Sequence, residues 1–158
     1  MPDIKLTVNK DDLERLLTKL ARLSPQNQVD TFRGAWRQAT IHVLGVLRSN
    51  VTGGILNVKT GALSQGMQFK IDEKKITSII GNRVLSGNPV PYTAIHEFGG
   101  DIYPIRAKWL RFKIGNDWVM TKHVRIPARK YMSRSVTEAE PGVMREMEDW
   151  VNKELNRK

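Results

Sequence analysis

Cysteine is absent from this 158-residue chain, and so are long apolar runs. Without cysteine there are no disulfide bonds, no thiolate nucleophile and no Cys-type zinc site, so packing must hold the fold together. No run of about 18 apolar residues occurs, which excludes a membrane-spanning helix, and we expect no membrane partner. The first residues, MPDIKLTVNKDD, have neither the basic start nor the apolar core of a secretory signal, so we expect none.

Recognisable catalytic groupings are also missing. His96 and Glu97 are adjacent, but the zinc-hydrolase pattern H-E-x-x-H needs a second histidine where this chain has Gly100. The acidic residues show no clustered spacing for Mg²⁺, and neither a nucleophile elbow nor a Gly-rich phosphate fingerprint occurs. We therefore predict no enzyme activity, no metal and no cofactor. A nuclease or peptidase using His96 and Glu97 is the least favoured of three hypotheses.

The positive charge is present in excess and is concentrated in one segment. The chain has a net charge of +10, and residues 101–134 hold nine Lys/Arg against two acids. Residues 135–158 reverse this balance, with four Lys/Arg against six acids. Such a distribution suits contact with nucleic acid, and equally suits copies of one chain that dock basic face to acidic face.

Apolar periodicity predicts three helices in one α+β domain over residues 1–158. The first is expected over residues 9–23, capped by Asn9 or Asp11 and ended by Pro25, and the second over residues 28–50. The closing helix is expected to start at Pro141 and reach residue 155, with a separate short turn over 134–140. The first helix should bury a stripe of five leucines: Leu13, Leu16, Leu17, Leu20 and Leu23. His42, beside the apolar stripe of the second helix, is expected to be a boundary residue.

Alternating patterns predict a mostly antiparallel sheet against which these helices pack. One short strand is expected over residues 3–8, and a hairpin joins 67–71 to 75–80. The strongest hairpin signal is the turn GND between KWLRFKI and WVMTKHVRI. In this long hairpin, one sheet face is expected to be basic. Its members are Arg111, Lys113, His123 and Arg125.

The stretch PYTAIHEFGG, residues 91–100, is expected to form a corner between two elements. It can make one or two helical turns with Ile95 and Phe98 facing the core. Gly99 or Gly100 would then end the turn with a positive φ. His96 and Glu97 would lie partly exposed at this corner.

Two motifs, YTAIHEFGG and IPARKYM, resemble the bacteriophage virion morphogenesis family. Its members are small tail-completion proteins encoded near head–tail joining genes in phages and prophages. They typically read Tyr-Ala-x-Ile-His-x-Phe-Gly-Gly and, later, Ile-Pro-Ala-Arg-Pro-Phe, and Lys130 and Tyr131 depart from that Pro-Phe. The matching residues are Tyr92, Ile95, His96, Phe98, Gly99 and Gly100 in the first motif, and Ile126, Pro127, Ala128 and Arg129 in the second.

This resemblance implies a structural, non-catalytic virion protein at the head–tail junction or the head-proximal end of the tail. Related neck and tail-completion proteins act as homo-oligomeric rings, often hexamers, around the channel for packaged DNA. The implied partners are tail terminator or tail tube proteins and head connector proteins, with assembly in the bacterial host cytoplasm. A head-to-tail ring needs two complementary surfaces, for which the basic hairpin and the acidic closing helix are candidates.

The second hypothesis is a non-specific DNA-binding module. Here the predicted basic face of Arg111, Lys113, His123 and Arg125 would hold phosphates. No helix-turn-helix, zinc finger or basic recognition helix is visible. The same face would serve equally well as a solvated surface or as a contact between subunits.

Overall fold

A computed structural model describes residues 9–56, 61–72, 74–82 and 93–157. Over these residues the chain forms five α-helices, one π-helical turn and six strands paired as three antiparallel two-stranded ladders. The predicted α+β class is confirmed. The single sheet is not, because the strands do not join into one. The strand predicted over residues 3–8 lies outside the described residues.

The chain divides into two compact units. The first comprises the described residues of Met1–Val90 and Tyr131–Lys158, and we call it the helical unit. The second, Pro91–Lys130, we call the hairpin unit. The helical unit therefore combines residues from both ends of the sequence. Most of the basic segment, residues 101–134, lies in the hairpin unit.

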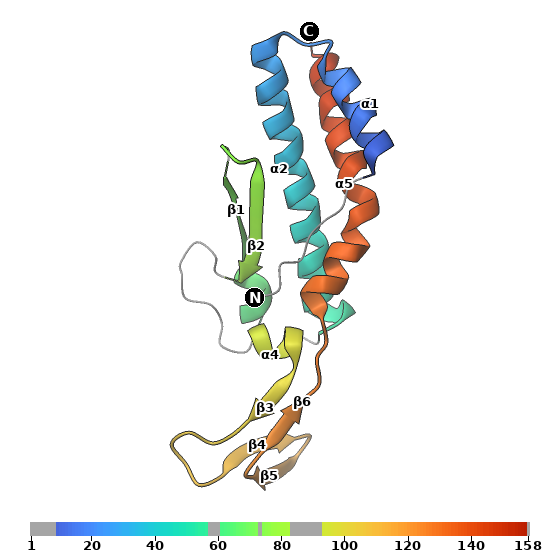
Figure 1. The fold of residues 1–158 in the computed structure, drawn as a ribbon. Helices are drawn as coiled ribbons and strands as arrows, with labels where there is room; N and C mark the ends of the chain where they lie inside the picture. Colours follow the sequence, from blue (N-terminus) through green and yellow to red (C-terminus); the bar gives the residue numbers. More distant parts are fainter. Residues whose placement is uncertain (1–8, 57–60, 73, 83–92, 158) are drawn as a thin grey trace. The chain divides into compact units, whose positions relative to one another are not determined.

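Three long helices form the framework of the helical unit (Figure 1). Asn9 caps the first of them, as predicted, because its side chain accepts a hydrogen bond of 2.9 Å from the Asp11 N–H. Pro25 begins the second helix, where a missing N–H and a fixed φ are tolerated. The first helix ends earlier than expected, at Leu20. The bounds are α1 Lys10–Leu20, α2 Pro25–Ser49 and α5 Tyr131–Leu155.

One hairpin and two short helical turns complete the helical unit. The turns are η1 (Asn50–Gly54) and α3 (Ala62–Gln65), and the strands are β1 (Met67–Asp72) and β2 (Thr77–Asn82). The predicted hairpin is confirmed, because β1 and β2 pair antiparallel. It lies along α2 (Figure 1), where the hydroxyls of Thr40 and Ser78 form a hydrogen bond of 2.7 Å.

The closing helix α5 is continuous through Pro141, which corrects both the expected start and the expected separate turn over 134–140. A proline inside a helix loses one hydrogen bond and costs about 3 kcal/mol or more. Here the helix is buried on both sides of the proline. Tyr131 and Ala139 before it are fully buried, and Val143 after it is 2% exposed. Packing on both sides therefore outweighs the local preference to break the helix.

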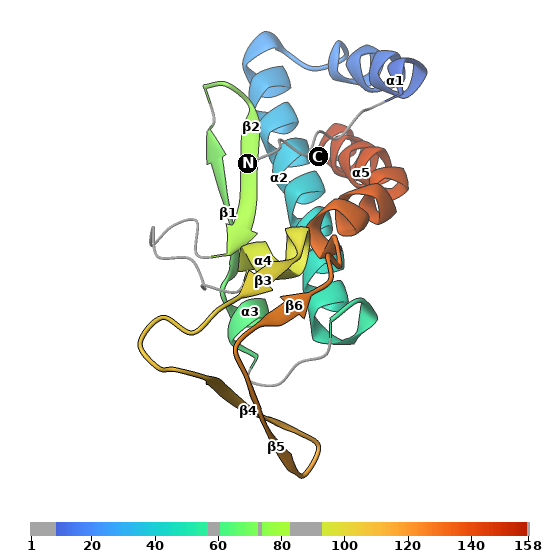
Figure 2. The ribbon, with the colours of Figure 1, turned by 60° about the horizontal axis from the view of Figure 1, so that its bottom comes forward.

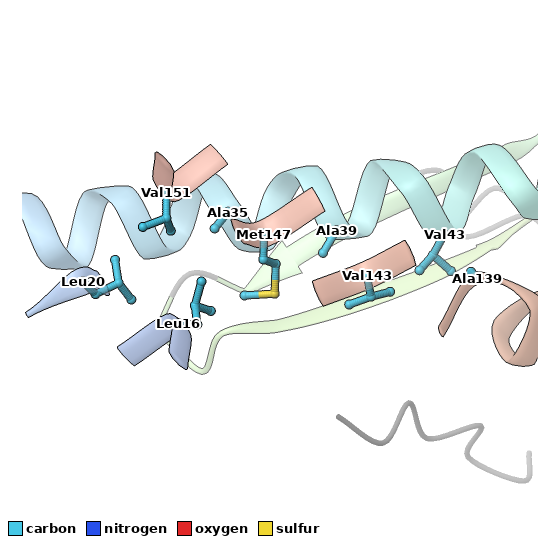
Figure 3. Close-up of a cluster of buried hydrophobic side chains, with 9 residues drawn as sticks. All are labelled: Leu16, Leu20, Ala35, Ala39, Val43, Ala139, Val143, Met147 and Val151. Carbon is cyan, nitrogen blue, oxygen red and sulfur yellow. The ribbon is translucent and has the colours of Figure 1, made fainter. Parts of the chain in front are cut away.

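The main core of the helical unit lies where α1, α2 and α5 meet (Figure 3). Small side chains on α2 and α5 let these helices approach closely, and larger ones from α1 and α5 fill the rest. His42 lies at this boundary, as predicted, half-buried with its Nδ1 3.8 Å from the Glu146 carboxylate. The core residues are Leu16, Leu20, Ala35, Ala39, Val43, Ala139, Val143, Met147 and Val151.

The predicted stripe of five leucines is only partly buried. Leu16 and Leu20 are buried and Leu23 is half-buried, whereas Leu13 and Leu17 are 39% and 51% exposed. The stripe spans a wider arc of α1 than its packing partners cover. Two leucines therefore remain on the surface.

The hairpin unit contains one short helix and two ladders (Figure 2). The long second strand of the predicted hairpin is interrupted at Lys122 and His123. There the Thr121 side chain accepts from the His123 N–H at 3.3 Å and donates to the His123 carbonyl at 2.9 Å. The elements are α4 Thr93–Phe98, β3 Gly100–Ile102, β4 Leu110–Ile114, β5 Asp117–Thr121 and β6 Val124–Ile126, with β3 paired to β6 and β4 to β5.

Candidate functional site

The two sequence motifs meet in the hairpin unit, although they are far apart in the sequence. Gly100 pairs with Ile126 at the start of the β3–β6 ladder. The Arg129 N–H donates to the His96 carbonyl at 2.9 Å, and the Lys130 N–H donates to the Glu97 carbonyl at 3.2 Å. Carbonyls in the last turn of a helix have no partner within it, so the second motif caps α4. We call α4, Gly99, β3, β6 and residues 127–130 the motif junction.

At Gly99 the backbones of the two motifs approach each other closely. The φ of Gly99 is 70°, as predicted for the end of this turn, and its N–H bonds to the Ile95 carbonyl at 2.9 Å. A Cβ at this position would lie 2.6 Å from the Ala128 nitrogen and 2.9 Å from the Ile126 carbonyl oxygen. Glycine is therefore required here by conformation and by space.

Lys130 has a backbone conformation and a hydrogen bond that a proline at this position could not reproduce. Its φ is 50°, a value that the proline ring cannot adopt. Its N–H also donates to the Glu97 carbonyl, and proline has no N–H to donate. The next residue, Tyr131, is fully buried in the helical unit.

Two side chains of α4 lie opposite to expectation. Phe98 is 48% exposed rather than directed into a core, and Glu97 is 2% exposed rather than partly exposed. Ile95 and His96 are half-buried, and Tyr92 lies outside the described residues. A helix of six residues is too short for apolar spacing to define its inner face, which is why the prediction failed there.

The pKa of His96 is lowered, first by burial and then by the Arg129 guanidinium. The imidazole in the folded protein therefore takes up a proton at a lower pH than in the unfolded chain, where the ordinary pKa is about 6.5. We expect the free energy of unfolding to fall as pH drops below about 6.5, toward the lowered pKa. Urea unfolding at several pH values between about 7.5 and 5.5 gives the free energy of unfolding of the wild type and of His96→Gln. The difference between the two proteins isolates His96, because the contributions of the other titrating groups are the same in both. Identical pH profiles would contradict the lowered pKa of His96.

The predicted basic face is not one surface, because three of its four members lie on two different ladders and His123 lies between β5 and β6. Arg111 and Lys113 lie on β4, whereas Arg125 lies on β6 directly opposite Asp101. His123 Nε2 lies 2.7 Å from an Asp101 carboxylate oxygen, and its ring stacks on Tyr103 with centroids 5.1 Å apart. The Asp101 carboxyl group therefore lies beside the His123 ring, on the residue opposite Arg125 in the ladder.

A different face of the β4–β5 hairpin gathers cations and aromatic rings. Arg111 lies opposite Met120 and Lys113 opposite Trp118, so their side chains share one side of the ladder. The Arg111 guanidinium carbon is 4.3 Å from the Trp118 ring centroid, and the Lys122 ammonium is 5.0 Å from that of Trp109. All members of this cationic–aromatic face are exposed. They are Trp109, Arg111, Lys113, Trp118, Met120 and Lys122.

Of this cationic–aromatic face, the sequence placed only Arg111 and Lys113 on the predicted basic face. In the second strand, alternation read back from Val124 and Ile126 places Trp118 on the inner side. The interruption at His123 breaks that alternation, and the pairing of Trp118 with Lys113 sets the true side. The GN turn between Ile114 and Asp117 was the signal from which this register follows.

The helical unit holds a cavity of about 420 Å³ between α2, β2 and α5. Its lining is mainly apolar and includes no acidic, basic or histidine side chain. Among the described residues, no three His, Asp or Glu side chains are grouped so that they could hold a metal ion. No helix in the described part of the chain is long and apolar enough to span a membrane. Comparison with known protein families, with curated proteins and with solved structures found no match.

Proposed function

We propose that this chain is a structural protein of a phage virion that completes the tail and joins it to the head at the connector. The motif junction is the observation that supports this role. The two motifs that resemble the virion morphogenesis family cap and pair with each other, so they build one structure in three dimensions. His96 and Glu97 contribute their backbone carbonyls to this structure. We therefore assign them an architectural role instead of a catalytic one.

A ring around a DNA channel requires each chain to present two complementary surfaces. Contacts between subunits are usually formed by large apolar side chains that a single chain leaves exposed. The segment between β3 and β4 exposes 61% of Tyr103 and 96% of Ile105. On α1, Leu13 and Leu17 are one turn apart and both exposed. We propose that these two apolar surfaces take part in contacts between subunits.

The acidic closing helix is a weaker candidate for a docking surface than its composition suggests. Residues 135–158 hold six acidic side chains, and four of them already contact another side chain of the same chain. Apolar contacts therefore carry more of the proposed ring than a basic-to-acidic match would. The four pairs are Glu138 with Asn50, Glu146 with His42, Glu148 with Lys19, and Glu154 with Arg157.

The proposed function predicts that the purified protein forms closed rings, alone or on tail tubes. Size-exclusion chromatography with light scattering measures the mass, and negative-stain images show whether the rings close. Ile105→Ser should abolish the rings, because it removes the most exposed apolar side chain of the proposed contact. Ile79→Ser is the matched control, since Ile79 is 62% exposed on β2 and has no part in that contact. A wild-type protein that stays monomeric and never binds tails would contradict the proposal.

A further inference from the structure

We infer that the cationic–aromatic face of the β4–β5 hairpin binds single-stranded nucleic acid, holding phosphates with its cations and bases with its rings. This inference goes beyond the assembly role and does not depend on it. It rests on Arg111, Lys113, Trp118 and Met120, which the hairpin register places on one side of the ladder, and on the Lys122 ammonium over the Trp109 ring just beyond the strands. It also differs from the DNA-binding hypothesis drawn from sequence, because His123 and Arg125 have no part in it.

The arrangement of charge on this face favours an anionic partner. Three cations project from it, and the one acid of β4 and β5, Asp117, lies opposite Ile114, whose side of the ladder faces away from Arg111 and Lys113. Arg111 packs over the Trp118 ring, and Lys113 lies 5.8 Å from the same ring centroid. A guanidinium stacked on a ring keeps its N–H edge available, and that edge matches the oxygens of a phosphate.

The aromatic side chains favour unpaired bases over a duplex. Trp118 and Met120 are 58% and 60% exposed, and Trp109 is 39% exposed. A duplex offers its phosphates to such a surface but keeps its base faces stacked inside. A single strand offers both, and a groove or face that alternates cations with aromatic rings is how proteins bind it without sequence preference.

Two other partners fit the face less well. An acidic surface on a second copy would have to come largely from the closing helix, where most acids already contact their own chain. A membrane surface would need apolar or aromatic groups at the tip of the hairpin. The turn at that tip is Gly115, Asn116 and Asp117, and the exposed Ile114 beside it lies on the side of the ladder away from Arg111 and Lys113. On the cationic–aromatic face each ring instead has a positive charge beside it, with Arg111 over Trp118 and Lys122 over Trp109.

The direct test is fluorescence anisotropy of the full chain with a labelled oligothymidylate of about 20 nucleotides, compared with a duplex of equal length. We expect tighter binding to the single strand. If three cations each neutralise one phosphate, affinity should fall about twentyfold between roughly 50 and 200 mM salt. Trp118→Ala should weaken binding to the single strand by about tenfold, the effect of losing one stacked base.

A second variant keeps the test decisive if Trp118→Ala does not fold, which circular dichroism would show. Arg111→Gln with Lys113→Gln removes two charges from the face and leaves both rings in place. Its matched control is Lys74→Gln with Lys75→Gln, which removes two charges from exposed positions in the helical unit. We expect a loss of about tenfold or more for the first pair and a change within about twofold for the control.

Four results would overturn the inference. Equal losses in both glutamine pairs would mean that net charge alone attracts the oligonucleotide. Equal affinity for duplex and single strand, with no effect of Trp118→Ala, would mean phosphate contact without base stacking. Tighter binding to vesicles containing phosphatidylserine, lost in the same variants, would assign the face to a membrane surface. Self-association that the same variants abolish, without any binding of the oligonucleotide, would assign it to a second copy.

Discussion

Gly99→Ala should destabilise the hairpin unit by about 3 kcal/mol or more, because the substitution conflicts with both the backbone angle and the space at the motif junction. The left-handed conformation costs a residue with a Cβ about 1 to 2 kcal/mol. The new Cβ would also lie 2.6 Å from the Ala128 nitrogen and 2.9 Å from the Ile126 oxygen, both of them backbone atoms. A flexible side chain could move aside, but here the second motif itself must shift, and overpacking of this kind costs about 1 to 3 kcal/mol.

Gly115→Ala is the matched control for this prediction. Gly115 also has a positive φ, 60°, but a Cβ there would meet nothing within 4 Å. It therefore bears only the conformational cost of about 1 to 2 kcal/mol. Urea unfolding of the two variants, together with hydrogen exchange at the Arg129 and Lys130 amides, measures the difference. Equal losses of stability and of amide protection would contradict the close approach of the two motifs.

The same pair of variants connects the junction to the proposed function. The motif junction includes β3, after which the chain continues to the exposed Tyr103 and Ile105. If these residues form a subunit contact, Gly99→Ala should lower the fraction of chains in rings, and Gly115→Ala should leave it near the wild-type value. Light scattering measures the fraction of chains in rings. If rings persist in a Gly99→Ala protein of reduced stability, the motif junction is not required for assembly.

Local signals in the sequence were enough to predict much of the fold. The Asn9 cap, the β1–β2 hairpin and the GN turn each depend on a few neighbouring residues whose chemistry fixes the backbone. The positive φ at Gly99 belongs to the same class, since only glycine adopts that angle without strain. These features depend on residue type and on short spacings along the chain, so they could be predicted from the sequence.

The features that sequence reasoning missed depend on partners far along the chain. Pro141 reads as a helix start, and only burial of the helix on both sides of it keeps α5 continuous. The side on which Trp118 lies is set by its pairing with Lys113 and not by alternation within its own strand. The burial of Glu97 likewise belongs to the folded surroundings of a helix too short to show a periodic pattern.

Leu16→Ala should lower the free energy of unfolding by about 3 kcal/mol, because Leu16 is fully buried in the core between α1, α2 and α5 (Figure 3). Truncation of a buried leucine loses its transfer free energy and leaves a cavity, for a total of about 2 to 5 kcal/mol. Leu17→Ala provides the control at the next position of the same helix. Leu17 is 51% exposed, so its truncation should cost about 0.5 kcal/mol or less.

The comparison of Leu16→Ala with Leu17→Ala isolates burial, because both variants make the same chemical change in the same helix. Differences in helix propensity and in the unfolded chain therefore cancel. Urea unfolding at low protein concentration, where subunit contacts are dissociated, should show the gap of about 2.5 kcal/mol between them. Equal losses at low concentration would contradict the packing of α1 against α5. A Leu17→Ala loss that grows with protein concentration would instead show that another copy covers this side chain, since association stabilises the chain by mass action.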